Sequence, residues 1–301
     1  MRELSAVMGE LPLPVAEVAM IADHTAKWAY DCSMIGHDYK YDSIFCRLHE
    51  ELYKRNVLAD IIPTDRELND YKLVILPSCV IMEDQFAAKL RDYVAGGGVV
   101  LAWGQLGMRD SNDNFLAERG PQHLQNLFGA MITGGMYLHS QMAPDESWGK
   151  LKRIFALKIE GDLGGDAAVG TAGLWAGDIE TTSGKALLKY TDDAYRGQAA
   201  VIENHYGNGT AVYVAAAELD QELSGKVFDY LLKKAGAGFS HGLPEYVEVV
   251  ARGPITFVIN HRDEEVLFDT GRHIEAIRGT AEHGIIRLKP YDVCIYRNAL
   301  F

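Results

Sequence analysis

The first hundred residues alternate short apolar runs with amphipathic stretches, and this alternation restricts the fold more than any other feature of the sequence. Between the runs, residues 41–55 and 83–95 place apolar side chains at the three-to-four-residue spacing of a helix. Strands that are apolar on both faces are typical of a parallel sheet that helices cover on both sides. The pattern therefore predicts an α/β fold with a doubly wound, flavodoxin-like sheet. The apolar runs lie at residues 15–22, 57–62, 72–76 and 99–102.

The second half of the chain contains more strand-like segments. Residues 199–216 predict a β-hairpin around a Gly-Asn-Gly turn, and residues 220–234 predict a helix. Small residues then cluster at 236–242, and five short strand-like runs follow. We therefore expect a first domain at residues 1–238 and a small antiparallel β domain at residues 239–301.

The charge of the chain limits its partners and its location. The 301 residues carry 42 acidic and 29 basic side chains, a formal net charge of −13. Nucleic acids and anionic membrane surfaces both require a basic patch, so we expect neither as a partner. The first residues do not resemble a signal peptide, and no apolar run approaches the ~20 residues that span a bilayer. Together with sparse cysteines that form no C-x-x-C pair, these features predict a cytoplasmic protein.

Polar and aromatic side chains follow two of the expected strands and are candidate contact residues. Asp23, His24 and Trp28 come just after the first strand, and Trp103 ends the fourth. Ligands of parallel sheets bind beyond the carboxyl ends of the strands, so these four residues are candidates for contact with a ligand or a neighbouring domain. The alternative for the first group is structural, with Asp23 capping the next helix and Trp28 packing as an anchor.

No catalytic residue, metal site or cofactor is expected. Cys79 follows the third strand, but Ser78 and Val80 flank it in place of the glycines of a nucleophile elbow, so we predict a buried, inert thiol. The segment that begins at Asp110 matches the start of a calcium-binding loop, yet Phe115 stands where such a loop needs glycine. The ten histidines show no metal-binding spacing.

Several segments together resemble family 42 β-galactosidases. Three resemble the domain that follows the catalytic barrel in that family, a fourth resembles a hairpin near the end of that domain, and two more resemble the family's small C-terminal β domain. One departure is that this chain has Ala26, Lys27 and Trp28 where the family often has an asparagine and two aromatic residues. The segments are, in order, Asp23–Trp28, Asp60–Pro77, Leu90–Trp103, Asn204–Ala215, Val247–Val266 and Leu288–Arg297.

The resemblance implies an assembly role without catalysis. In the family this domain has a class I glutamine amidotransferase-like fold and carries the contacts of a homotrimer. The two catalytic carboxylates lie in a barrel of about 250 residues, for which the segments assigned here leave no room. We therefore expect a non-catalytic oligomerisation and support part, whose partners are further copies of itself or a galactosidase barrel, in the same precursor or on a separate chain.

Two other functions remain open from the sequence. The chain could be an independent hydrolase that uses Asp23, His24 or Cys79. It could also be a carbohydrate-binding module that uses the aromatic side chains of Trp28, Trp103 and Trp175.

Overall fold

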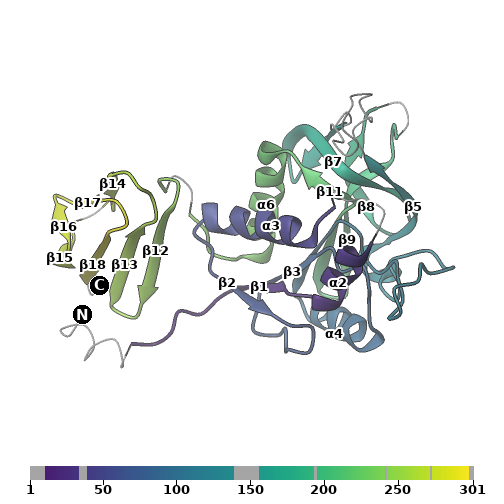
Figure 1. The fold of residues 1–301 in the computed structure, drawn as a ribbon, viewed down its shortest axis with the longest axis horizontal. Helices are drawn as coiled ribbons and strands as arrows, with labels where there is room; N and C mark the ends of the chain where they lie inside the picture. Colours follow the sequence, from purple (N-terminus) through teal and green to yellow (C-terminus); the bar gives the residue numbers. More distant parts are fainter. Residues whose placement is uncertain are drawn as a thin grey trace. The chain divides into compact units, whose positions relative to one another are not determined.

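The computed structural model describes residues 11–33, 39–138, 156–192, 195–240, 243–271 and 273–297 (Figure 1). The chain divides into two compact units. The large unit contains Glu17–Glu51 and Ala59–Gly238, and the small unit contains Met1–Ala16, Leu52–Leu58 and Phe239–Phe301. No helix in the described ranges is long and apolar enough to cross a membrane.

Five strands of the large unit form the parallel part of its sheet, in the spatial order β2-β1-β3-β4-β10. Every residue of β1, β3, β4 and β10 is buried, as expected for strands that are covered on both faces. The strands are β1 (Val18–Ile21), β2 (Ala59–Ile62), β3 (Leu73–Pro77), β4 (Val99–Trp103) and β10 (Gly209–Val214).

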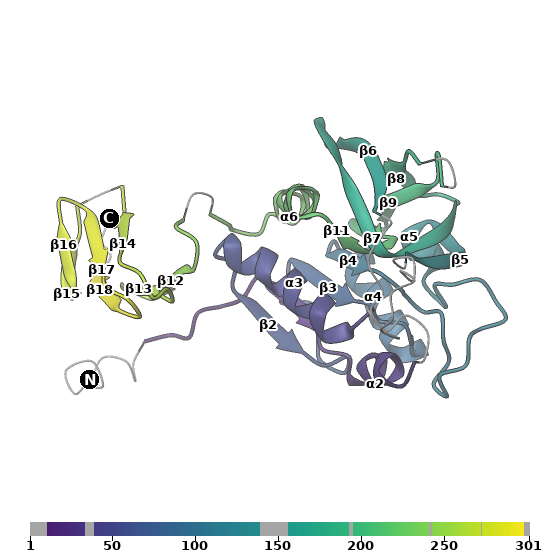
Figure 2. The same ribbon diagram turned by 45° about the horizontal axis from the view of Figure 1, so that its top comes forward.

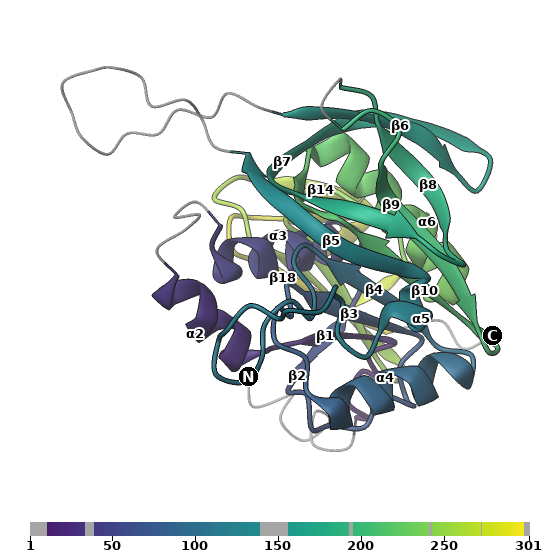
Figure 3. The same cartoon turned by 90° about the vertical axis from the view of Figure 1, so that its right-hand side faces the viewer.

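Six further strands continue the same sheet with antiparallel pairing, in the order β10-β9-β8-β6-β7-β11, and β5 pairs with β7 outside this path. Figure 3 shows these strands extending from the parallel ones. The longest, β7, is 16 residues long and pairs with β5, β6 and β11. The strands are β5 (Ala130–Leu138), β6 (Leu157–Leu163), β7 (Asp166–Thr181), β8 (Lys185–Tyr190), β9 (Ala199–Tyr206) and β11 (Ala216–Leu219).

The prediction of a doubly wound, flavodoxin-like sheet of the class I glutamine amidotransferase type is wrong. The sheet has eleven strands, and six of the ten strand pairs among the described residues are antiparallel. Helices and parallel strands share the chain up to residue 103, although no helix separates β2 from β3, whereas most of residues 130–219 form strands without intervening helices. The pattern of the first hundred residues therefore does not represent the whole unit.

Five helices of the described residues accompany the large sheet. Helices α4 and α6 cover opposite faces of its parallel part (Figures 1 and 2). Each presents one apolar face to the strands: α4 buries Phe86, Leu90 and Val94, and α6 buries Phe228 and Leu231 among others. The helices are α2 (His24–Cys32), α3 (Tyr41–Lys54), α4 (Asp84–Ala95), α5 (Gln125–Phe128) and α6 (Gln221–Ala235).

The small unit contains only antiparallel strand pairs in its described residues. A four-stranded sheet has the order β12-β13-β18-β15, and a three-stranded sheet has the order β14-β17-β16. Val258, Ile286, Leu288 and Cys294 are fully buried in a common core. The strands are β12 (Val247–Arg252), β13 (Ile255–Asn260), β14 (Val266–Asp269), β15 (Glu275–Arg278), β16 (Thr280–Glu282), β17 (Ile285–Leu288) and β18 (Val293–Arg297).

The outer edge of β12 is covered by the side chain of Asn56. Its amide nitrogen donates to the backbone oxygen of Val249 at 2.8 Å, and its amide oxygen accepts from the backbone N–H of Val249 at 2.9 Å. The side chain thus pairs with the edge strand as a neighbouring peptide group would. Asn56 itself has φ of 52°, a left-handed conformation that asparagine tolerates better than most residues.

This pairing yields a prediction for Asn56→Gly and Asn56→Ala. Glycine keeps the left-handed φ and removes both hydrogen bonds, whereas alanine also adds backbone strain. We expect the Val249 amide to exchange hydrogen faster in both variants, and Asn56→Ala to lose about 2–4 kcal/mol of unfolding free energy, more than Asn56→Gly. Hydrogen exchange followed by mass spectrometry and urea unfolding measure the two effects. Unchanged exchange at Val249 in Asn56→Gly would contradict the edge role.

Candidate functional site

Asp23 lies directly after β1 and caps helix α2. Its carboxylate oxygen Oδ1 accepts from the backbone N–H of Ala26 at 3.0 Å, and its own N–H donates to the Tyr41 hydroxyl at 2.8 Å. Burial raises the pKa of the Asp23 carboxyl, while the hydrogen bonds from the helix N-terminus oppose that shift. The carboxylate therefore fixes the start of α2 and sets the direction of its outer face.

His24 and Trp28 lie one helical turn apart on α2. Trp28 is 64% exposed, and the two ring centroids are 6.5 Å apart. On the same helix, Lys27 pairs with Asp31 at 2.9 Å and with Asp42 at 2.7 Å. The helix therefore presents an aromatic pair to solvent beside a compact charge cluster. An exposed tryptophan of this kind is a typical anchor of protein interfaces.

Trp103 does not join this pair. Its side chain is buried, its indole N–H donates to the backbone oxygen of Ala217 at 3.0 Å, and its ring lies 6.3 Å from the ring of Phe228. The structure thus brings His24 and Trp28 together at the surface and places Trp103 in the core between β4 and α6. The contact assignment, which stays a prediction, now depends on the residues of α2.

A cluster of tyrosines fills the space beyond the carboxyl ends of β3 and β4. The Tyr39 hydroxyl lies 2.8 Å from Ser78 Oγ and accepts from the backbone N–H of Gln105 at 2.9 Å. The side-chain amide of Gln105 donates to the Tyr137 hydroxyl at 2.8 Å, and the Tyr30 ring stacks on Tyr39 at 4.8 Å. Burial raises the pKa of Tyr39 to about 12, so the phenol stays neutral. Ligands of parallel sheets usually bind beyond the carboxyl ends of the strands, and here the chain's own tyrosine and glutamine side chains fill that space.

Sequence reasoning missed this cluster because tyrosines distant in the chain carry it. Two residues could have indicated it: Ser78, which follows β3, and Gly104, which follows β4. Ser78 has φ of 47°, and Gly104 has φ of 76°. A Cβ atom at Gly104 would lie 2.4 Å from the Tyr39 hydroxyl, so the close approach of that ring requires glycine.

Arg109 attaches the loop after β4 to helix α2. Its guanidinium lies 4.7 Å from the ring centroid of Phe115, bonds Asp113 Oδ1 at 2.8 Å, and contacts the backbone oxygen of Ala29 at 3.4 Å. Asp110 closes the same loop, because its Oδ1 accepts from the backbone N–H groups of residues 112 and 114 at 2.9 Å each. Phe115 is 61% exposed. Phe115 is thus a second exposed aromatic residue. Its ring packs on Arg109, which also contacts the backbone of α2, the helix that carries Trp28.

Cys79 lies in the core after β3. The thiol is fully buried, and burial raises its pKa well above the usual range, with a smaller contribution from the charge of Asp23. A thiolate nucleophile is therefore strongly disfavoured at this position.

Alkylation of the native protein tests the state of the four free cysteines. Cys32 and Cys46 are exposed, whereas Cys79 and Cys294 are buried with raised pKa values. We expect iodoacetamide at neutral pH to modify the exposed pair at least ~10-fold faster than the buried pair, which should react only in denaturant. Peptide mass spectrometry gives the rates. Rapid modification of native Cys79 would show an accessible thiolate and contradict this interpretation.

Comparison with known proteins identifies the family. A family model described as the β-galactosidase trimerisation domain matches residues 16–237. β-Galactosidase BgaB of Geobacillus sp. is 28% identical over 291 residues, which cover 94% of this chain and 41% of that protein. β-Galactosidase LacZ of Lactobacillus acidophilus is 27% identical over 292 residues, with the same coverage.

The fold shows the same likeness. The crystal structure of the β-galactosidase from Bacillus circulans sp. alkalophilus superposes with a TM-score of 0.84 at 24% identity, over 99% of this chain and 43% of that chain. The chain thus spans about two fifths of the length of the relatives it matches. The resemblance seen in the sequence is therefore confirmed. Because the family model matches more than half of the residues, this chain belongs to the β-galactosidase trimerisation domain family of the family 42 glycoside hydrolases.

Proposed function

We propose that this chain is the assembly and support part of a β-galactosidase, which joins three copies and leaves hydrolysis to a catalytic barrel. The observation that carries the proposal is the match of residues 16–237 to a trimerisation domain. The barrel belongs either to the same precursor or to a separate chain. The four free cysteines suit a cytoplasmic location, and residues 1–238 and 239–301 remain our proposed domains.

We assign the contact surface to the outer face of α2. His24 and Trp28 supply exposed aromatic area there, and Phe115 adds a second exposed ring on Arg109, which contacts the helix backbone. Tryptophan residues that become buried at an interface often dominate its binding energy. The net charge of −13 opposes association, and salt screens such repulsion beyond about 8 Å at physiological ionic strength.

The two alternative functions have less support. A hydrolase would need Asp23, His24 or Cys79 as a catalytic group. The Cys79 thiol is buried with a raised pKa, the Asp23 carboxylate caps α2, and the His24 ring lies at the surface beside Trp28. A carbohydrate-binding module on the tryptophans would need exposed rings. Of the three candidates, Trp28 is 64% exposed, but Trp103 and Trp175 are 3% and 1% exposed and cannot form a platform with it. Cβ atoms at Gly135 and Gly177 would come within 3 Å of the Trp175 ring.

Light scattering after size exclusion tests the assembly role. We expect a trimer of about 100 kDa from the 33.3 kDa chain at micromolar concentrations, and tighter association at higher salt. Trp28→Ala should weaken association ~10-fold or more. Tyr291→Ala, which removes a 73% exposed aromatic residue from the small unit, is the matched control and should leave it unchanged. A monomer at every concentration and salt level would overturn the assembly role, and a trimer insensitive to Trp28→Ala would overturn the assignment to α2.

A second test concerns hydrolysis. Since we assign both catalytic carboxylates to a barrel outside this chain, we expect no turnover of nitrophenyl β-galactoside by the pure chain. The control is the same preparation with added full-length family 42 β-galactosidase, which must restore turnover. Activity that co-purifies with the chain through two orthogonal columns would contradict the proposal.

A further inference from the structure

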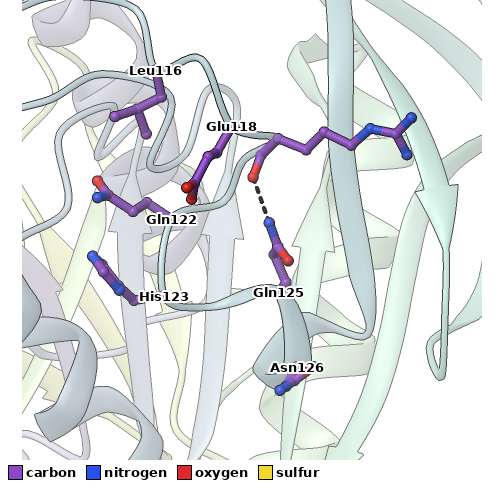
Figure 4. A pocket seen from close by; sticks show the side chains of 7 residues that line it. Leu116, Glu118, Gln122, His123, Gln125 and Asn126 are labelled. Carbon is purple, nitrogen blue, oxygen red and sulfur yellow. Dashed lines mark hydrogen bonds between the residues drawn. The ribbon is translucent and has the colours of Figure 1, made fainter.

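Side chains that line a hollow do not by themselves define a ligand. Beside the start of α5, Glu118, Gln122 and Asn126 line such a hollow, but the side chains around it are largely exposed and do not converge on one point (Figure 4). The turn between β12 and β13 differs, because a segment of the same chain is seated on it. The contacts of that segment define what the turn recognises.

Arg252, the last residue of β12, bonds two successive peptide groups of this segment. Its Nε donates to the backbone oxygen of Pro12 at 3.2 Å, and its Nη2 donates to that of Leu11 at 3.1 Å. All three residues belong to the small unit. A guanidinium presents its N–H donors in a rigid planar fork, so it can bond two neighbouring carbonyl groups at once, whereas a lysine ammonium is a point charge on a flexible stem.

The sequence of the segment suits a partner that reads backbone oxygens. It contains the run Leu11-Pro12-Leu13-Pro14. Each proline lacks an N–H donor and disfavours the helical conformation at the residue before it. Residues 11–16 accordingly form neither helix nor strand. An extended, proline-containing chain of this kind makes no internal hydrogen bonds, so its carbonyl groups remain available to a partner.

Gly253 lets the proline ring approach the turn closely. Its φ of 55° is left-handed, and a Cβ atom there would lie 3.2 Å from Cδ and 3.5 Å from Cγ of Pro12. A side chain at this position would therefore crowd the ring as well as strain the backbone. Arg252 and Gly253 thus recognise two different features of the segment, the pair of carbonyl groups and the proline ring.

The segment is attached at few points. The side chains of Leu13 and Val15 are 76% and 84% exposed, so they add little buried area. A weak contact is sufficient, because a short tether gives a segment an effective concentration on the order of millimolar at its site. Strand β12 has a separate support, since Asn56 covers its edge at Val249. The segment can therefore leave the turn while the strand stays paired.

We propose that the β12–β13 turn is a docking site for extended leucine–proline segments, and that the chain's own Leu11–Pro14 occupies it as a detachable strap. Arg252 bonds two carbonyl groups of the strap, and Gly253 receives the ring of Pro12. The strap leads directly into β1, so its docking and release change the freedom of the chain that enters the large sheet. The proposal does not depend on trimer formation or on the presence of a barrel.

The Nε–H group of Arg252 reports docking in heteronuclear NMR spectra of the full chain, because a hydrogen-bonded N–H exchanges with water more slowly than a free one. Its signal is assigned by its loss in Arg252→Lys. Pro12→Ala removes the ring and frees the preceding residue, so we expect the exchange of the Arg252 Nε–H to become ~5-fold faster or more. Leu13→Ala is the matched control, since it shortens an exposed side chain of the same segment, and it should exchange as the wild type does.

A peptide added in trans distinguishes recognition by the turn from a merely structural contact. A synthetic peptide with the sequence of residues 10–15, at about 10 mM, should restore slow exchange of the Arg252 Nε–H in Pro12→Ala. The same peptide with glycine in place of both prolines should not. The proposal is overturned by unchanged exchange in Pro12→Ala, by equal action of the two peptides, or by failure of the first peptide to slow the exchange.

A second measurement keeps the proposal testable if Pro12→Ala folds poorly. Release of the strap frees the peptide bond after Val15 for elastase, so Arg252→Lys should be cleaved there ~5-fold faster than the wild type. Peptide mass spectrometry locates and times the cut. Equal rates in Arg252→Lys and wild type would show that the guanidinium does not hold the segment, and would overturn the proposal.

Discussion

Strand β10 joins two kinds of sheet, and the large unit depends on the hydrogen bonds along both of its edges. One edge pairs parallel with β4 and the other pairs antiparallel with β9, so that Tyr213 lies between Ala102 and Ile202. A Cβ atom at Gly209 would lie 2.2 Å from the backbone oxygen of Val94, so the end of α4 approaches this strand as closely as glycine permits. Through β10, the helix-covered parallel strands and the long antiparallel strands form one hydrogen-bonded layer.

Single helices and hairpins could be predicted from the sequence because the spacing of apolar residues and the turn residues within each segment determine them. Residues 199–216 form the expected hairpin, and the helices expected at 41–55 and 83–95 are present within one residue. The partners of the antiparallel strands could not be predicted, because β7 owes its length and its three neighbours to contacts far away in the chain. The four apolar runs of the first hundred residues fit a doubly wound sheet, but they form only part of a larger mixed sheet.

The same distinction applies to the candidate site residues: some of their roles follow from neighbouring residues in the sequence, and others depend on distant segments. The structural alternative predicted that Asp23 caps the next helix and that Trp28 packs as an anchor. The structure shows the cap, but it leaves Trp28 64% exposed. Whether a tryptophan faces solvent does not follow from its position, since Trp28 and Trp103 both come near strand ends and only the first is exposed. The tyrosine cluster at Ser78 and Gln105 depends on side chains from several segments, which no spacing rule connects.

The edge of β12 depends on the Asn56 side chain being an amide and not an acid. Hydrolysis of the Asn56 amide would replace the nitrogen that now donates to the oxygen of Val249 by a second carboxylate oxygen, which would repel that acceptor. The Val249 N–H would keep its acceptor, but the Val249 oxygen would be open to solvent and to other chains, and unpaired edge groups can template intermolecular β-sheets. The chemical identity of one side chain thus protects the small unit against edge-to-edge association with other copies.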